Sequence, residues 1–312
     1  MSHSQINALI TLIEDPDPEI FSHIRTELTK KGETIIPDLE RYWELNAYGD
    51  LFQDRVEQLI HTIQYEAIEG HLSTWKEDEC NDLLDGALLV NRYQYPTCDV
   101  ADLRDQINRI RQDIWLELND SLTALEKVKV FNHIIYEVHG FEGNKQNYSS
   151  PQNSYLQDVL TSKKGNPLSL AVIYRILAES LDVPIFGVNL PNHFILAYVD
   201  ETAIMNLGDG GVPSDNGILF YINPFSKGEV IHKTEIDEFL DYLDLPKRVS
   251  FYHPCDNKVI LQRMLNNLVY SYSQLGKEVK VEELRNLLGL FATAQEGSSA
   301  ANDPTGGTQQ DL

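Results

Sequence analysis

The sequence predicts an α+β protein in which one central helix packs on a small, mostly antiparallel sheet, with helical segments before and after this core. Three observations support this fold class. Up to residue 181 the apolar residues recur every three or four positions, which is the period of a helix. Between residues 185 and 231 they fall in short extended runs. Beyond residue 236 the helical period returns.

The first part of the chain is expected to be entirely helical. The first helix has an apolar face between Ile6 and Ile13, and Asp15-Pro16-Asp17-Pro18 ends it. Asp17 is placed to cap the next helix, with Pro18 as its first residue. Further helical patterns occupy residues 20–28, 35–43, 51–68, 83–90 and 100–118. Short helices joined by polar turns resemble a HEAT-like pair.

The middle of the chain contains the helix that we expect to be buried. The segments before it are a helix over 122–138 that begins after Asp120-Ser121 and ends at His139-Gly140, a polar loop over 141–153 and a short helix over 154–160. Gly165-Asn166-Pro167 then leads into a helix over 168–181 whose surface is nearly all apolar. A helix that is apolar on every side belongs in the interior of a protein.

The extended runs that follow predict the sheet. Strands are expected at residues 185–190, 194–199, 203–207, 218–222 and 230–231, with Gly-, Asp- and Asn-rich turns between them. Helices are expected after the sheet at residues 236–243, 257–275 and 280–291. The last residues, 294–312, contain few bulky apolar side chains, so we expect them to be disordered.

These patterns divide the chain into four parts. We assign residues 1–98 to an N-terminal helical region, 99–250 to the core with the sheet, 251–293 to a C-terminal helical segment, and 294–312 to the disordered tail.

Composition excludes several classes of protein. With 48 acidic against 25 basic residues the net charge is −23, which repels phosphate backbones and argues against nucleic-acid binding. No apolar run reaches the ~18 residues of a membrane helix, and no secretory signal is visible. Three scattered cysteines predict neither disulfides nor a metal site, so we expect no cofactor and a reducing, cytoplasmic location.

One histidine is placed as a catalytic histidine would be. His193 stands at the start of an apolar strand, where the fold can fix the orientation of an imidazole ring. Asn223 ends a later strand and is placed to accept a hydrogen bond from that ring. Cysteine proteases of the papain type use a Cys-His-Asn set in this way. A histidine held at a strand edge without a catalytic task is the other interpretation.

The sequence has no cysteine nucleophile to match this histidine. A thiol at the start of the central helix would be activated by the helix dipole, but no cysteine lies between Cys98 and Cys255. Ser169 is the only hydroxyl at that helix start. A serine is much harder to ionise than a cysteine, and a residue in the first turn of a helix also serves as a capping residue.

Three local motifs together resemble a known family. They are Gly165-Asn-Pro-Leu-Ser-Leu-Ala, then Leu190-Pro-Asn-His-Phe-Ile-Leu, and then Ile222-Asn-Pro-Phe-Ser-Lys-Gly. They look like the transglutaminase-like superfamily, and more narrowly like its bacterial invasion-regulator branch, whose members often end in a tetratricopeptide-like segment. Residues 256–272 resemble the start of such a segment.

This resemblance implies a papain-like core and a departure from the active pattern. Active members carry Cys at the start of the central helix, where this chain has Pro167 or, one turn away, Ser169. His193 matches the family's histidine. Asn223 stands where Asp is usual, and Asn192 stands where Gly is usual.

We therefore expect a non-catalytic member of the family that binds a protein or peptide, or acts as a regulatory module. Its relict cleft, between the central helix and the sheet, would serve as the binding groove together with the helical ends; the groove residues would be Asn166, Pro167, Asn192 and Phe194. One alternative is a hydrolase or peptidase that uses Ser169, His193 and Asn223. Another is a helical protein in which the core only holds the two helical ends together.

Overall fold

The computed structural model describes residues 3–44, 49–78, 82–200 and 217–292. The chain forms two compact units, Met1–Thr74 and Trp75–Leu312, and the boundary falls within a single helix, α4 (Asp50–Glu77). The predicted tail over 294–312 and the predicted strand over 203–207 lie outside the described residues.

The N-terminal unit is helical, as predicted. Its elements are α1 (His3–Thr11), the 3-10 turns η1 (Leu12–Glu14) and η2 (Gly32–Ile35), α2 (Pro18–Thr29), α3 (Ile36–Glu44) and the first part of α4. Asp17 caps α2, because its side chain accepts a hydrogen bond from the backbone of Glu19 at 2.8 Å. The apolar faces of these helices meet in a small core of their own, which includes Ile10, Leu28 and Phe52.

The second unit begins with helices that differ in detail from the predicted ones. They are α5 (Leu83–Gln94), α6 (Val100–Glu117), α7 (Ala124–Asn132), the π-helix η3 (His133–Val138) and α8 (Leu156–Ser162). Thr123, rather than Asp120 or Ser121, caps α7 through a capping box with Glu126. The predicted loop over 141–153 contains the short strand β1 (Glu142–Gly143) and leads into a 3-10 turn, η4 (Pro151–Ser154).

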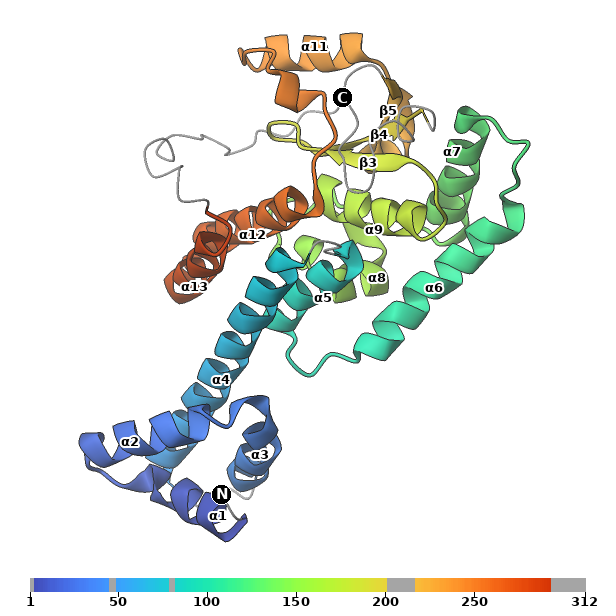
Figure 1. Cartoon of the computed structure of the whole chain (residues 1–312). Helices are drawn as coiled ribbons and strands as arrows, with labels where there is room; N and C mark the ends of the chain where they lie inside the picture. The colour runs from blue at the N-terminus through green and yellow to red at the C-terminus, as the bar shows by residue number, and fades with distance from the viewer. Residues whose placement is uncertain (1–2, 45–48, 79–81, 201–216, 293–312) are drawn as a thin grey trace. The chain divides into compact units, whose positions relative to one another are not determined.

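The central helix is α9 (Pro167–Glu179), and it is buried as predicted. Every residue from Pro167 to Ala178 is buried except Arg175, which is half-buried. The Arg175 guanidinium lies over the ring of Phe186 at 4.7 Å and pairs with Glu179. The helix packs on the strands β3 (Ile185–Val188) and β4 (Ile195–Val199), as Figure 1 shows.

The sheet is a four-stranded antiparallel meander in the order β3-β4-β5-β6, with β5 at Ile218–Asn223 and β6 at Glu229–Ile231. A central helix against a small antiparallel sheet confirms the predicted α+β fold. A separate parallel pair joins β1 to β2 (Lys164–Gly165), directly before the start of α9. This pair fixes the loop after η3 beside the N-terminus of α9, which the sequence pattern did not predict.

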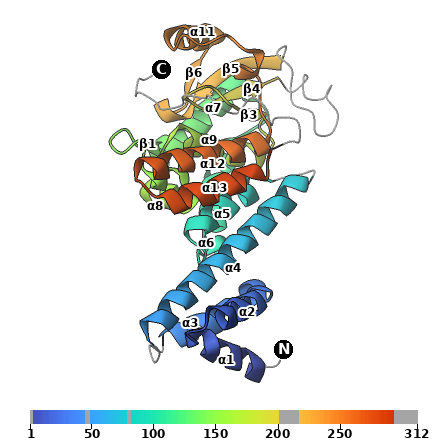
Figure 2. The ribbon, with the colours of Figure 1, turned by 90° about the vertical axis from the view of Figure 1, so that its left-hand side faces the viewer.

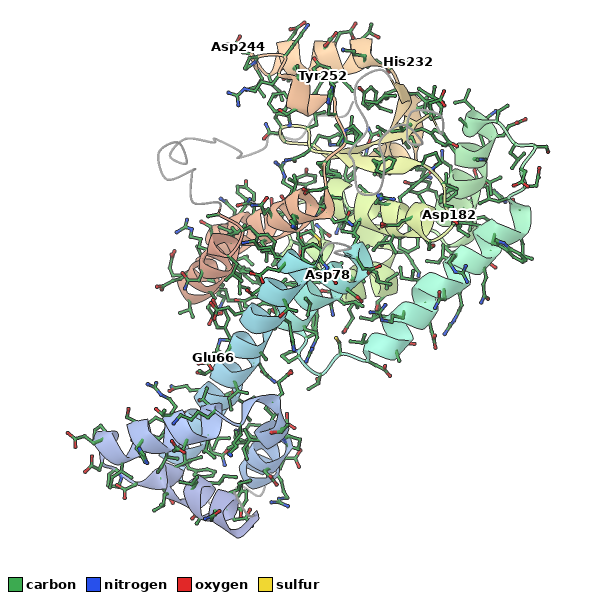
Figure 3. All side chains as sticks on the ribbon, viewed as in Figure 1. Glu66, Asp78, Asp182, His232, Asp244 and Tyr252 are labelled. Carbon is green, nitrogen blue, oxygen red and sulfur yellow. The ribbon has the colours of Figure 1, made fainter. Side chains whose placement is uncertain are left out.

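Helices α11 (Lys233–Tyr242), α12 (Asn257–Gln274) and α13 (Glu278–Gly289) complete the unit, with a 3-10 turn η7 (Val249–Phe251). Figure 2 shows α12 and α13 side by side in front of α5. Polar contacts join α12 to α5 and to the start of α8. The Tyr272 hydroxyl lies 3.0 Å from the Tyr155 hydroxyl and donates to the Gln94 side chain at 2.9 Å. The Lys280 ammonium also donates to Gln94 and lies over the ring of Tyr272. Figure 3 shows the described side chains on the ribbon and labels, among others, the acidic residues Glu66, Asp182 and Asp244.

A tight turn holds the end of β5 against α7. After the 3-10 turn η6 (Pro224–Ser226) the chain passes through two left-handed residues, Lys227 at φ 55° and Gly228 at φ 73°. The Asn132 side chain donates to the Gly228 carbonyl at 2.7 Å and accepts a hydrogen bond from the Tyr174 hydroxyl at 3.1 Å. A Cβ at Gly228 would lie 1.9 Å from the Asn132 side chain, so only glycine fits.

Replacing this glycine should destabilise the protein more than replacing a comparable glycine in open space. Gly276 also has a positive φ, at 65°, but a Cβ there would meet nothing within 4 Å. Gly276→Ala should therefore lower the free energy of unfolding only by the cost of a left-handed backbone at alanine, about 1–2 kcal/mol. Gly228→Ala adds a clash and the loss of the Asn132 contact, worth about 1–3 kcal/mol more. Urea unfolding of both variants measures the difference, and equal losses would contradict this account of the turn.

Candidate functional site

His193 and Asn223, which the sequence pattern paired, lie within hydrogen-bonding distance. The His193 Nε2 and the Asn223 Oδ1 are 3.2 Å apart. Asn223 is the last residue of β5 and is only 1% exposed. Its Oδ1 also accepts from the backbone N–H groups of Phe225 and Ser226, and its Nδ2 donates to the Ser226 hydroxyl at 3.3 Å. The local turn therefore holds this amide in place.

The residue before His193 has a special backbone conformation. Asn192 lies in the left-handed region at φ 57°, within a turn closed by a hydrogen bond from the His193 N–H to the Leu190 carbonyl. Asparagine tolerates this region better than most residues, and glycine tolerates it best. The turn aims His193 into a half-buried position, where its ring centroid lies 6.2 Å from that of Phe239 on α11.

The start of α9 is closed by a capping box. The Asn166 side chain accepts a hydrogen bond from the Ser169 N–H at 2.8 Å, and the Ser169 hydroxyl oxygen accepts one from the Asn166 N–H at 3.0 Å. The Ser169 hydroxyl also donates to the Asn166 carbonyl at 3.2 Å, and the Asn166 Nδ2 donates to the Ser154 hydroxyl at 3.0 Å. The cap thus uses both the proton and a lone pair of the Ser169 hydroxyl.

Ser169 is not brought to His193 as a nucleophile would be. Among the described residues, all hydrogen bonds of the Ser169 side chain go to Asn166, and none goes to His193. Ser169 is 6% exposed, and a Cβ on the neighbouring Gly165 would lie 2.5 Å from its hydroxyl, so the site is tightly packed. A serine nucleophile needs a base within hydrogen-bonding reach and an exposed oxygen.

The four predicted groove residues differ in exposure. Asn166, Pro167 and Phe194 are buried, and Phe194 packs so closely on Gly187 that a Cβ there would lie 2.8 Å from its ring. Only Asn192 among the four is partly exposed.

The surroundings of Cys255 do not activate its thiol. Burial, and next the charge of Asp256, raises the pKa of the Cys255 thiol to about 12. The Cys255 N–H donates to the Gly187 carbonyl, which fixes this residue beside β3 before α12 begins. Cys98 borders a cavity described below and forms no disulfide. The described residues contain no group of three or more His, Cys, Asp or Glu side chains arranged to hold a metal ion.

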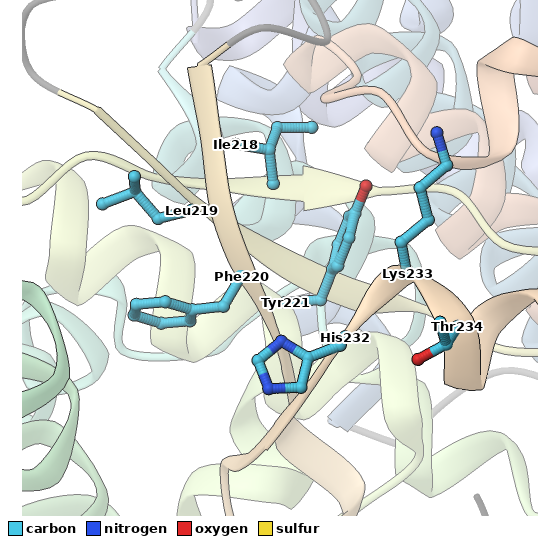
Figure 4. A pocket seen from close by; sticks show the side chains of 7 residues that line it. All are labelled: Ile218, Leu219, Phe220, Tyr221, His232, Lys233 and Thr234. Carbon is cyan, nitrogen blue, oxygen red and sulfur yellow. The ribbon is translucent and has the colours of Figure 1, made fainter.

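The structure contains two cavities whose lining residues do not include His193, and the sequence pattern predicted neither. The first, of about 480 Å³, is lined by Ile218, Leu219, Phe220, Tyr221, His232, Lys233 and Thr234 (Figure 4). The second, of about 470 Å³, lies between the end of α5, the start of α6 and α8, and its lining includes Cys98, Asp99 and Asp102. One signal for the first cavity is present in the sequence, since the strand over 218–222 is followed by a much shorter one at 230–231.

The core defined by α9, the meander and the His193–Asn223 pair agrees with a comparison to protein families. A model of the transglutaminase-like superfamily matches residues 101–266, which is more than half of the 312 residues. The chain therefore belongs to the transglutaminase-like superfamily. In the part of the chain that the structure describes, no helix is both long and apolar enough to cross a membrane.

Relatives occur in bacteria and mammals. A UPF0162 protein of Xylella fastidiosa strain Temecula1 is 30% identical over 204 residues, which cover 63% of this chain and 67% of that protein. F-box only protein 21 of Mus musculus is 25% identical over 258 residues, covering 75% of this chain but only 40% of the mouse protein. A UPF0162 protein of Pasteurella multocida is 33% identical over 114 residues, covering 36% of this chain and 43% of that protein. No solved structure matches the chain.

The capping role of Ser169 gives a stability prediction. Ser169→Ala leaves the buried Asn166 N–H without an acceptor and should lower the free energy of unfolding by about 1–3 kcal/mol. Ser180 is the control at the other end of α9, because it is exposed and its hydroxyl donates only to the Leu177 carbonyl. Ser180→Ala should cost about 1 kcal/mol or less. Chemical denaturation measures both, and a neutral Ser169→Ala would contradict the capping role.

The raised pKa of Cys255 gives a pH prediction. The thiolate is the reactive form, and a pKa of about 12 in place of 9.0 lowers its fraction at pH 8 by about a thousandfold. The greater nucleophilicity of a high-pKa thiolate offsets part of this, so the folded protein should react with DTNB at least about 30-fold more slowly than the denatured protein. The rate should rise about tenfold per pH unit between pH 7 and 10. A Cys80→Ser/Cys98→Ser variant isolates the signal, and a rate plateau near pH 9 would contradict the prediction.

Proposed function

We propose that this protein is a non-catalytic member of the transglutaminase-like superfamily that binds a protein or peptide and acts as a regulatory module. The observation that carries this proposal is the closed start of α9. Where active members of the family carry a cysteine, this chain has a buried proline followed by a serine whose hydroxyl is used in the helix cap. Acyl transfer through a thioester requires a thiolate at this place.

The surface around His193 is the proposed contact region of the relict cleft. Asn192 and His193 are its partly exposed residues, at the turn before β4. The buried Asn166, Pro167 and Phe194 would shape this region from below rather than contact the partner. His193 can both donate and accept hydrogen bonds, and Asn223 keeps its ring in one orientation.

The finer assignments of the family and of the domains also belong to this proposal. Helices α12 and α13, of 18 and 12 residues, form an antiparallel pair close in length to one tetratricopeptide repeat of roughly 34 residues, which supports the invasion-regulator branch. We retain the division at 1–98, 99–250 and 251–293, with HEAT-like helices in the first part. The likeness to F-box only protein 21 supports a role in protein interactions.

The remaining parts of the proposal follow from charge and cysteine content. A net charge of −23 favours a protein partner over a nucleic acid. The two described cysteines are free thiols, which suits a reducing compartment such as the cytoplasm.

A hydrolase that uses Ser169, His193 and Asn223 is the competing function, and the His193–Asn223 contact is the observation in its favour. It requires Ser169 to leave its cap and expose its hydroxyl, which would also leave the Asn166 N–H unpaired.

An activity and binding experiment separates the two functions. The wild-type protein should hydrolyse no member of a panel of fluorogenic amides and esters above the buffer rate, and His193→Ala should behave identically. In pull-downs from cell extract, quantified by mass spectrometry, His193→Ala should lose a specific partner by about tenfold, or 1.4 kcal/mol. His133→Ala is the matched control, because His133 lies on the exposed surface beside Glu137.

Turnover that disappears in both Ser169→Ala and His193→Ala would establish the hydrolase instead. An unchanged set of partners in His193→Ala would remove the binding role from the relict cleft.

A further inference from the structure

One edge of the sheet is only partly paired. Strand β5 runs from Ile218 to Asn223, but β6 pairs only with its last three residues: Tyr221 with Ile231, Ile222 with Val230, and Asn223 with Glu229. On that side of β5, no described strand pairs with Ile218, Leu219 or Phe220. In the described part of the chain these three residues thus form a sheet edge, the kind of edge to which a further strand can add.

The cavity of about 480 Å³ lies where β6 would continue. The β5–β6 register would place His232 opposite Phe220 and Lys233 opposite Leu219 if the strand went on. Instead the chain turns into α11 at Lys233. Figure 4 shows the outcome: Ile218 to Tyr221 from β5 and His232 to Thr234 from the start of α11 line one space. A space bordered by an open strand edge can accept an extended peptide.

The charge of this cavity is opposite to that of the chain. The protein has 48 acidic and 25 basic residues, yet the described residues that line the cavity include one lysine, one histidine and no carboxylate. The nearby Glu235 carboxylate is already bound to the His232 N–H at 2.6 Å. Lys233 and His232 in the lining therefore favour an acidic group in the ligand.

Unused donors in the wall point to the same ligand. The N–H groups of Lys233 and Thr234, the first two of α11, make no hydrogen bond with any described residue. The Lys233 ammonium lies over the Tyr252 ring at 4.8 Å and pairs with no described carboxylate. Backbone donors at the start of a helix together with an ammonium group suit a carboxylate. Leu219, which is 49% exposed, supplies an apolar contact on the opposite wall.

We propose that this cavity binds an extended segment of a partner protein that carries an Asp or Glu side chain. The segment adds to the sheet beside Ile218, Leu219 and Phe220, antiparallel to β5 in the direction that β6 would have taken. Its carboxylate meets Lys233 and the first N–H groups of α11, and an apolar side chain packs on Leu219. Backbone pairing provides affinity, and the acidic residue fixes the register.

This inference rests on the proposed function, since both make the protein a binding module, but it requires a different surface from that of His193. A second copy of this chain is disfavoured as the occupant, because two chains of charge −23 repel each other.

A peptide selection tests the inference. Panning a random linear octapeptide library on the full chain should select peptides that share one acidic position among β-branched or aromatic residues. The synthetic peptides should bind with micromolar dissociation constants in isothermal titration calorimetry. Lys233→Glu should weaken binding at least about tenfold, as expected when a close ion pair becomes a repulsion, and Lys233→Arg should retain it. N-methylation along the peptide should abolish binding at alternate positions only, which is the period of strand pairing.

The controls separate this site from the rest of the protein. Lys247→Glu makes the same charge change at a lysine that pairs with Asp241 near the other end of α11, and it should bind the peptide as the wild type does. His193→Ala should also bind normally. Thermal unfolding checks that Lys233→Glu is folded, and Lys233→Pro offers a second variant, because proline fits the first position of a helix and removes both the ammonium group and one N–H.

Several outcomes would overturn the inference. They are the absence of selected peptides, selected peptides without a common acidic residue, equal binding by Lys233→Glu, or N-methylation effects that do not alternate. Dimerisation of the chain that Lys233→Glu abolishes would assign the edge to a second copy instead. Peptide binding that is lost in His193→Ala but not in Lys233→Glu would support the proposed function and place the peptide in the relict cleft.

Discussion

The burial of α9 on nearly all sides is the constraint on which the rest of this structure depends. A helix in the interior cannot expose its first N–H groups to water, so they need protein acceptors. The Asn166 side chain accepts a hydrogen bond from the Ser169 N–H, and the Ser169 hydroxyl oxygen accepts one from the Asn166 N–H. The Ser154 hydroxyl accepts a hydrogen bond from the Asn166 side chain, and the β1–β2 pair fixes the residues directly before the cap. The polar groups of Asn166 and Ser169 at the start of α9 are therefore used to stabilise the buried end of the helix.

The same hydrogen bonds limit the chemistry that is possible at the start of α9. A helix start can activate a thiolate, but here the first helical residue is a proline and the only hydroxyl is bonded to the backbone. The His193–Asn223 pair does not depend on a nucleophile, because the turn after β5 fixes Asn223 through the N–H groups of Phe225 and Ser226. The pair is thus an ordered feature that is held in place without a nucleophile beside it.

The second feature of interest arises from unequal strand lengths. β6 ends after three residues because the chain turns into α11. Within the described residues, this leaves part of β5 without a strand partner on that side and the first two N–H groups of α11 without a hydrogen bond. The two sets of groups border one cavity. Although the chain has a large excess of acidic residues, the described lining of this cavity contains Lys233 and His232 and no carboxylate.

Local sequence patterns determined the fold class, the cap at Asp17, the buried helix and the approach of His193 to Asn223, because apolar period and helix-start residues act over a few positions. They did not determine the π-helix after α7, the length of α4 or the β1–β2 pair. Nor did they show whether Ser169 faces His193 or its own helix cap, or that a cavity lies beside β5. These features depend on contacts between residues far apart in the chain, and only the packed tertiary structure brings such residues together.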